Sequence, residues 1–222
     1  ALMNTANDLG NTGPDFRFGW GHVNTFRALR LLEEQRWLED QVDQGQQQQH
    51  TLAVPANARQ VKVMVYWSER PAAINAAKAL LNDLDLSITG PDGTVYQPWK
   101  LNASPNAITL ALPAGRGVDT LNNVEQVAID VPPAGNYTIK INGSEVPFGP
   151  QPYVLAWEFL TDDIRITYPS GGEGFVPGET ERIHWDAFDN QGTFSLRYST
   201  DDGFSWQQIA DLPGNQRMFD WQ

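Results

Sequence analysis

Hydrophobic and polar residues alternate with a period of two in several short segments between residues 61 and 159. Such alternation is typical of strands that place one face in a core and the other in solvent. Turn sequences such as Pro91-Asp92-Gly93 and Pro133-Ala134-Gly135 separate the segments. The pattern predicts strands with these apolar positions: Val61, Val63, Val65 and Trp67; Leu84, Leu86 and Ile88; Val127, Ile129 and Val131; Tyr137, Ile139 and Ile141; Tyr153, Leu155, Trp157 and Phe159.

The predicted fold is mainly β. Short strands with turns between them favour a jelly-roll or β-sandwich domain over residues 41–162. A second β module over residues 163–222 resembles an immunoglobulin or fibronectin domain in its strand pattern. Immunoglobulin sandwiches need ~100 residues, so we expect this module to be truncated. Its predicted strands are Ile164 to Tyr168, Arg182 to Trp185, Phe194 to Ser199 and Ser205 to Ile209.

Residues 1–40 differ from the rest because a glycine-rich loop leads into a helical pattern. Asn24 is a good N-cap, and the sequence after it predicts a helix from Thr25 to Glu34. Phe26, Leu29 and Leu32 would share one face of that helix. Because the segment itself offers little to pack against that face, we expect its partner to lie outside this chain.

Two other segments are mainly polar or mixed. Asp40 to His50 contains four consecutive glutamines and is expected to be a linker or the polar start of a strand. Asn75 to Leu81 is expected to form one helical turn that ends at Asn82.

Composition excludes several classes of function. The net charge of −12 repels nucleic acid and anionic membranes. The absence of cysteine excludes disulfides, thiolate zinc sites and a cysteine nucleophile. No apolar run approaches the ~20 residues that a membrane-spanning helix needs. The sequence has no signal peptide, but we expect both ends to be cuts within a longer gene product.

The opening segment resembles the end of a subtilisin-family catalytic domain. The resemblance rests on Ala1-Leu2-Met3-Asn4-Thr5-Ala6, the glycine-rich loop, and Phe18-Gly19-Trp20-Gly21-His22-Val23-Asn24. In that family a helix carrying the nucleophilic serine leads into the first of these stretches, and Phe18 stands where a tyrosine is usual. The resemblance therefore implies that the serine precedes Ala1.

A second series of motifs resembles the C-terminal β-barrel domain of calcium-dependent alkaline subtilases. The series is Asn82-Asp83-Leu84-Asp85-Leu86, Gly90-Pro91-Asp92-Gly93-Thr94, Asn122-Asn123-Val124-Glu125, Ala134-Gly135-Asn136-Tyr137-Thr138-Ile139 and Gly149-Pro150-Gln151-Pro152-Tyr153. The two resemblances together cover about 160 residues of the chain. They imply an exported serine endopeptidase, at the cell surface or outside a bacterial cell, whose catalytic domain and protein substrates are the partners of this region.

The chain itself lacks the expected catalytic chemistry. Its three histidines, His22, His50 and His184, stand in a turn, a linker and a predicted strand, and no serine has a nucleophile motif. We therefore expect no catalytic residue and an inactive chain, with β domains that stabilise the protease. The alternatives are adhesion modules that contact glycans or a cell surface, and inert spacers.

An acidic cluster is the candidate site. Strand geometry places Asp83 and Asp85 on one face, about 7 Å apart, where two carboxylates repel unless a cation neutralises them. Ca²⁺ suits such a site because it takes 6–8 oxygen ligands, and the resemblance raises this expectation. The predicted ligands are Asn82, Asp83, Asp85, Asn122 and Glu125. The alternative is that the carboxylates are solvated or cap backbone groups.

The stretch Ser199 to Trp206 fits the Asp-box pattern S-x-D-x-G-x-[ST]-W. In families that carry it, the pattern forms a hairpin. We therefore expect Asp201 to accept backbone N–H groups, Gly203 to have a positive φ, and Trp206 to pack beneath the turn. With one copy present, a structural hairpin is favoured over a sugar site.

Overall fold

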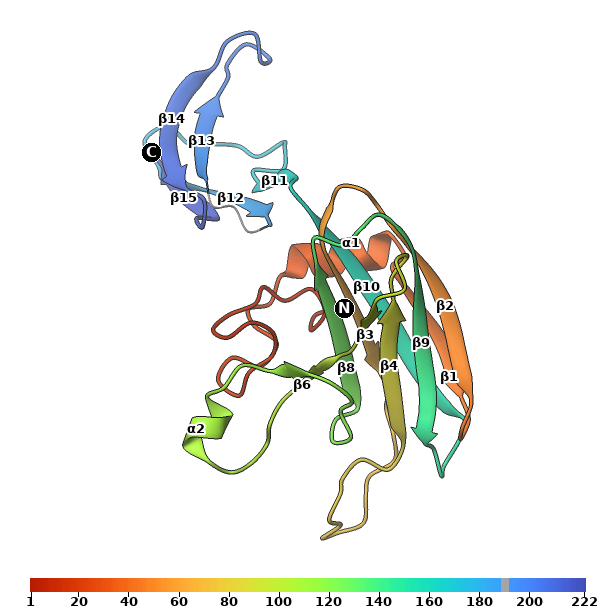
Figure 1. Ribbon diagram of the computed structural model, residues 1–222. Helices are drawn as coiled ribbons and strands as arrows, with labels where there is room; N and C mark the ends of the chain where they lie inside the picture. The colour runs from red at the N-terminus through yellow and green to blue at the C-terminus, as the bar shows by residue number, and fades with distance from the viewer. Residues whose placement is uncertain (189–191) are drawn as a thin grey trace. The chain divides into compact units, whose positions relative to one another are not determined.

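The computed structural model describes residues 1–188 and 192–222 (Figure 1). These residues form mainly antiparallel β-strands with two short helices, so the predicted mainly β class is confirmed. Contacts divide the chain into two compact units, Ala1–Leu160 and Thr161–Gln222. Within the described residues, no helix is long and apolar enough to cross a membrane.

The elements follow one another in a simple order along the chain. The first unit contains α1 (Thr25–Glu33), β1 (Trp37–Val42), β2 (Gln47–Val54), β3 (Ala58–Tyr66), β4 (Asp83–Thr89), β5 (Val95–Tyr96), β6 (Trp99–Lys100), α2 (Ala107–Leu110), β7 (Gly115–Arg116), β8 (Val124–Asp130), β9 (Gly135–Glu145) and β10 (Gln151–Thr161). The second contains β11 (Ile164–Tyr168), β12 (Glu181–Ala187), β13 (Thr193–Tyr198), β14 (Gln207–Pro213) and β15 (Met218–Trp221).

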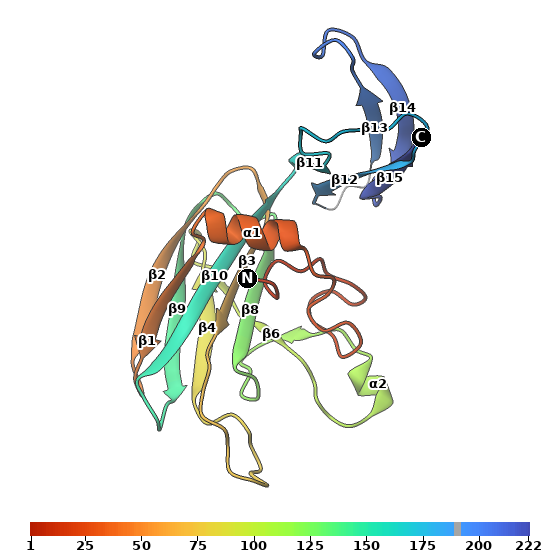
Figure 2. The same ribbon diagram turned by 180° about the vertical axis from the view of Figure 1, so that it is seen from behind.

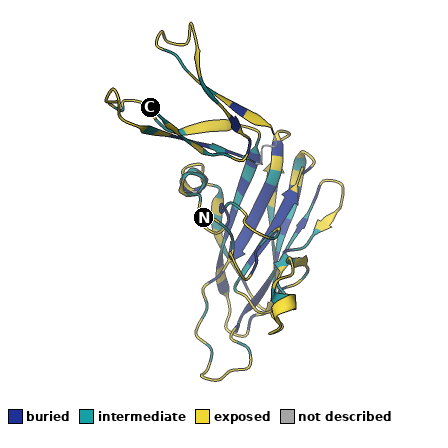
Figure 3. Ribbon diagram, turned by 90° about the vertical axis from the view of Figure 1, so that its left-hand side faces the viewer, coloured by how far each residue is buried: buried dark blue, intermediate teal, exposed yellow. Residues whose placement is uncertain are grey.

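Two four-stranded sheets enclose the core of the first unit. Their strand orders are β1-β10-β3-β8 and β2-β9-β4-β5. The pairs β1-β10, β3-β8, β2-β9, β4-β9 and β4-β5 are antiparallel. Most of the apolar positions that alternate in the sequence point inward from both sheets and are buried (Figure 3). Trp157 and Phe159 are only partly buried, and Val131 lies beyond the end of β8 and is 68% exposed. Trp67 anchors one end of this core: it is 1% exposed, and its indole N–H donates to the Asn82 carbonyl at 2.9 Å.

The first and last strands of this unit are neighbours. β1 pairs antiparallel with β10, so that Trp37 lies opposite Ala156 and Val42 lies opposite Gln151. The chain therefore enters β1 at the same end of the sheet at which it leaves β10.

The sheet β1-β10-β3-β8 is covered on its outer face as well. Lys62 and Met64 of β3 alternate with the core valines, yet both are buried. Ala128 of β8 and Ala156 of β10 are buried too. The cover is the segment of residues 1–36, whose helix α1 crosses the outer side of this sheet (Figure 2).

The predicted helix is confirmed, but its packing differs from the expected stripe. Asn24 accepts a hydrogen bond from the Arg27 N–H at 3.0 Å, as an N-cap should. The helix packs through Ala28 and Leu31, which are buried. Leu29 and Leu32, from the predicted apolar face, are 54% and 51% exposed.

One local prediction is confirmed and one is wrong. Of the two alternatives for the stretch from Asp40 to His50, the polar start of a strand is confirmed, because β1 ends within the stretch and β2 begins at Gln47. Gln47 and Gln49 of β2 are exposed, whereas Gln48 lies on the face that Leu52 continues and is partly buried. The helical turn predicted at Asn75 to Leu81 is wrong, since that segment contains turns and bends without a helix, and Asn75 has a φ of +64°.

The second unit contains a three-stranded sheet, β11-β12-β15, and the hairpin β13-β14. Its small core consists of Ile183, Trp185, Ala187, Phe194 and Leu212. Trp185 and Phe194 meet edge to face, with ring centroids 5.5 Å apart.

Candidate functional site

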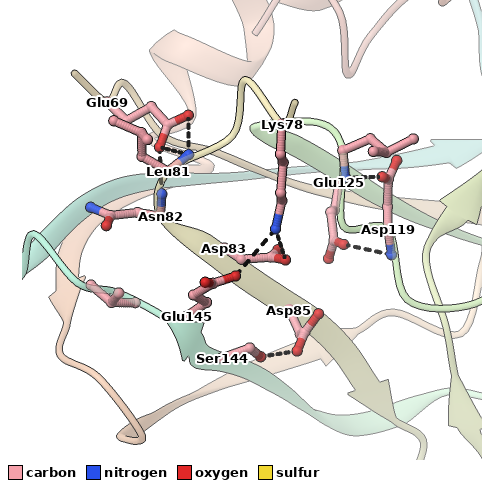
Figure 4. Close-up of polar contacts among 12 residues, drawn as sticks. Glu69, Lys78, Leu81, Asn82, Asp83, Asp85, Asp119, Glu125, Ser144 and Glu145 are labelled. Carbon is pink, nitrogen blue, oxygen red and sulfur yellow. Dashed lines mark hydrogen bonds and ion pairs between the residues drawn. The ribbon is translucent and has the colours of Figure 1, made fainter. Parts of the chain in front are cut away.

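The predicted acidic cluster forms around the first half of β4 (Figure 4). β5 pairs only with Ile88 and Thr89, so it leaves the edge of β4 open from Asp83 to Ser87. Glu125 of β8 and Asp119 of the loop before it approach this open edge, whereas Glu145 lies on β9, the strand that pairs with the other edge of β4 (Figure 4).

Asp83 is buried beside a lysine. Its Oδ2 atom lies 3.2 Å from Lys78 Nζ, and the same ammonium lies 3.3 Å from Glu145 Oε2. Burial raises the pKa of Asp83, and the charges of Asp85 and Glu145 add to this, although Lys78 opposes it. Burial would lower the pKa of Lys78, but the hydrogen bonds and charges of Asp83 and Glu145 together outweigh it, so the pKa is raised.

Two carboxylate oxygens of the cluster lack hydrogen-bond partners among the described residues. They are Oδ1 of Asp83 and Oδ1 of Asp85, each with almost no exposed surface. The other oxygen of Asp85 accepts a hydrogen bond from the Ser144 hydroxyl. Buried oxygens without donors are unfavourable, and a cation would satisfy them.

Glu125 connects the two sheets. It extends from β8 and is 1% exposed. Its carboxylate accepts the Leu86 N–H at 2.6 Å, at the edge of β4 that β5 does not cover, and the Asp119 N–H at 3.3 Å. Burial raises the pKa of Glu125 to about 8, with a smaller contribution from the charge of Asp85. This shift favours the protonated carboxyl at neutral pH.

The two predicted amide ligands are engaged elsewhere. The Asn82 amide group donates to Gln151 Oε1 at 2.7 Å and to the Phe148 carbonyl at 3.2 Å, and its oxygen accepts the Phe148 N–H. Asn122 donates to Asp119 Oδ2 at 2.6 Å. In the part of the chain that is described, no three His, Cys, Asp or Glu side chains are arranged so that they could hold a metal ion.

The sequence analysis did not predict three charged residues of this cluster, nor the residue that holds the loop beside it. Asp119 and Glu145 are remote in sequence from Asp83, and no local pattern indicates their approach. Lys78 is five residues from Asp83, but it lies in the segment for which a helical turn was predicted, so its contact with the carboxylate was not expected. Glu69 supports the loop that carries Lys78, because its carboxylate accepts the N–H groups of Leu81 and Asn82.

The three histidines occupy separate places in the structure. His50 Nε2 lies 2.8 Å from the Tyr153 hydroxyl and 3.6 Å from Asp40 Oδ2, which links β2 to β10 and β1. His22 pairs with Asn7 through backbone hydrogen bonds, and His184 lies opposite Met218 in the second unit.

The Ser199–Trp206 stretch forms the turn between β13 and β14. Asp201 accepts hydrogen bonds from the Ser205 N–H at 2.8 Å and from the Ser205 hydroxyl at 2.6 Å, and Gly203 has a φ of +88°. The Ser205 hydroxyl and N–H, with the Ser199 hydroxyl, lower the pKa of Asp201 to about 2. Trp206 donates to the Gly203 carbonyl but stays 59% exposed, so it is not packed fully beneath the turn as expected.

Comparison with known proteins gives one partial similarity and no family model that matches. Over 89 residues, or 39% of this chain, the sequence is 35% identical to the serine protease/ABC transporter B family protein tagB of Dictyostelium discoideum. The matched segment is 4% of that protein. The chain is therefore distantly similar to a small part of a protein that contains a serine protease.

Proposed function

We propose that this chain is the non-catalytic C-terminal region of an exported subtilisin-like serine endopeptidase and that it stabilises the catalytic domain. The observation that carries the proposal is the buried outer face of the sheet β1-β10-β3-β8. Residues 1–36, which resemble the end of a subtilisin catalytic domain, cover that face and belong to the same compact unit as the sheet.

Buried polar contacts support this attachment. The Lys62 ammonium donates to the Ala6 carbonyl at 2.9 Å, and Gln126 donates to Asn4 Oδ1 at 3.0 Å. Asn4 and Thr5 have no exposed surface. Polar groups buried with such partners fix one arrangement of two segments, because any displacement leaves them unpaired.

Exposed apolar residues on the same segment indicate where further protein would pack. We define the apolar flank as Leu2, Val23, Leu29 and Leu32, each more than half exposed. Four large apolar side chains within the first 32 residues are more than a solvated segment needs. The proposed occupant is the remainder of the catalytic domain, and the similarity to a serine-protease-containing protein supports this choice.

The strand order in the first unit supports its assignment as a jelly roll. If the strands of the two large sheets are renumbered 1 to 8 along the chain, the orders are 1-8-3-6 and 2-7-4-5. We interpret this arrangement as a jelly roll, in which two antiparallel sheets enclose one core. The second unit is interpreted as an immunoglobulin-like module with a reduced set of strands.

We also propose that the acidic cluster takes calcium, with Asp83 and Asp85 as ligands. The two unpaired Oδ1 atoms and the all-oxygen character of the cluster support this, but the amide of Asn82 does not fit. Lys78 already forms ion pairs with Asp83 and Glu145, so calcium binding requires this ammonium to move away.

The thermal inactivation of the parent protease tests the main proposal. Leu29→Glu/Leu32→Glu in the full-length enzyme should shorten the half-life at elevated temperature, because charges would be buried against the catalytic domain. The same pair in residues 1–222 alone should leave the melting temperature nearly unchanged, since both positions are exposed there.

Ile74→Glu is the matched control, because Ile74 is 94% exposed in a loop outside the flank. An unchanged half-life of the Leu29→Glu/Leu32→Glu enzyme would contradict the proposal.

A further inference from the structure

The second unit contains a cavity of about 460 Å³ bordered by β11 and β13. Its apolar lining includes Ile164, Ile166, Phe194, Leu196 and Trp206. Ile164, Ile166 and Trp206 are each more than half exposed, so the cavity opens to solvent. This volume lies within the range of small-ligand sites, which combine apolar walls with a few polar groups.

One polar group of the lining is a buried donor without an acceptor. The indole Nε1 of Trp185 makes no hydrogen bond to any described residue, although Trp185 is only 6% exposed. Most buried tryptophans donate this proton, because an unpaired buried N–H is unfavourable. Trp185 lines the cavity, so a ligand that displaces the atoms covering the indole nitrogen would bring an oxygen acceptor to this N–H.

A second polar group of the lining is a cation without a carboxylate partner. Arg197 donates to the Ser195 hydroxyl at 3.2 Å and forms no ion pair with a described residue. This is unexpected because residues 161–222 contain 11 acidic and 4 basic side chains. In the same unit, Arg182 binds Asp220 through two hydrogen bonds. Arg197 therefore keeps a guanidinium that can pair with an anion.

We propose that this cavity binds the C-terminal residue of a peptide that ends in a large apolar side chain. Such a residue presents three matching features: an apolar body for the walls, a carboxylate for Arg197, and a peptide carbonyl for the Trp185 N–H. Charge complementarity favours a carboxylate, since the lining contains a guanidinium and no acidic side chain among its described residues. The site is separate from the acidic cluster of the first unit.

The test is a titration of the ¹⁵N-labelled chain with N-acetyl-L-phenylalanine and with its carboxamide, followed by NMR. The indole signal of Trp185, identified by its loss in Trp185→Phe, should shift with the carboxylate probe. The carboxylate probe should bind at least about tenfold more tightly than the carboxamide, which lacks the charge that pairs with Arg197.

Arg197→Gln should abolish the difference between the two probes, whereas Arg165→Gln should retain it. Arg165 is an exposed arginine of the same unit that does not line the cavity, and neither substitution touches the core. This comparison remains decisive if Trp185→Phe does not fold.

Equal binding of the two probes, or no shift of any tryptophan indole signal at millimolar probe, would overturn the proposal. A third probe, 3-phenylpropanoate, has the ring and the carboxylate but no amide. Weaker binding of this probe supports a peptide terminus. Equal binding would overturn the peptide assignment and point to a free aromatic acid.

Discussion

Lys62 Nζ lies 3.3 Å from Glu158 Oε1, and the two side chains are 10% and 5% exposed. This ion pair joins β3 to β10 on the outer face of the sheet, beneath the N-terminal segment. Since the same ammonium donates to the Ala6 carbonyl, one side chain both neutralises a buried acid and attaches that segment.

Lys62→Met should destabilise the chain by about 3 kcal/mol, because it leaves the buried Glu158 without its cation. Chemical denaturation measures this change. Lys62→Met/Glu158→Met should recover much of the loss, since the second substitution removes the buried carboxylate that faced Lys62.

Lys140→Met is the control for Lys62→Met, because Lys140 lies on the other sheet and makes no polar contact among the described residues. A loss as large as that of Lys62→Met would show that the ion pair is not the cause.

Calcium should raise the melting temperature of the chain by several degrees over its value in EDTA. A site filled to 100 times its dissociation constant adds ~2.7 kcal/mol. Asp83→Asn and Asp85→Asn should each abolish the rise, and magnesium should not reproduce it. Lys78→Met should lower stability in EDTA but enlarge the response to calcium, because the competing ammonium is gone. An identical melting temperature in calcium and EDTA would contradict the calcium proposal and leave Lys78 as the cation that pairs with Asp83 and Glu145.

The free energy of unfolding in EDTA should fall as the pH rises from about 5 to about 8. Burial raises the pKa of Glu125 from 4.5 to about 8, so the folded chain keeps a proton that the unfolded chain releases in this window. The slope from this group is at most about 1.4 kcal/mol per pH unit. Glu125→Gln should remove that part of the slope, even though its amide lowers stability by losing one backbone hydrogen bond. A slope equal to that of the unsubstituted chain would contradict the assignment.

Gly21→Ala should disrupt the N-terminal segment. Gly21 has a φ of +104°, and an added Cβ would lie 2.1 Å from the Asn7 carbonyl oxygen, where Asn7 pairs with His22. Gly19 also has a positive φ, of +61°, but faces open space. Gly19→Ala should therefore cost only roughly 1–2 kcal/mol of backbone strain, and Gly21→Ala considerably more. Limited proteolysis and denaturation compare the two, and equal losses would indicate strain alone.

Local patterns predicted the core strands well because their periodicity reports burial on one face. Val61, Val63 and Val65 occupy every second position of β3, and all three face the core. The pattern could not indicate that Lys62 is also buried, since the segment covering it lies more than fifty residues away in the sequence. Likewise, the sequence pattern did not clearly indicate β2. This edge strand begins with glutamines, two of which, Gln47 and Gln49, are exposed.

The acidic cluster also contains contacts that local sequence patterns could not predict. Asp83, Asp85 and Glu125 do gather near one strand edge, where sequence reasoning expected them. Asn82 precedes the strand and turns toward Gln151, which no local spacing reveals. Lys78 reaches Asp83 because its loop folds back toward β4, and Glu69 holds that loop by accepting the Asn82 N–H. Both contacts depend on the tertiary structure.

The pairing of β1 with β10 has a mechanical consequence. The chain enters at Trp37 and leaves beyond Ala156 at one end of this strand pair. Tension applied between residues 36 and 161 would break the hydrogen bonds between these strands one after another from one end, rather than all together. If the region is held between an enzyme and a surface, pulling should peel β1 away at low force before the rest of the sheets yields.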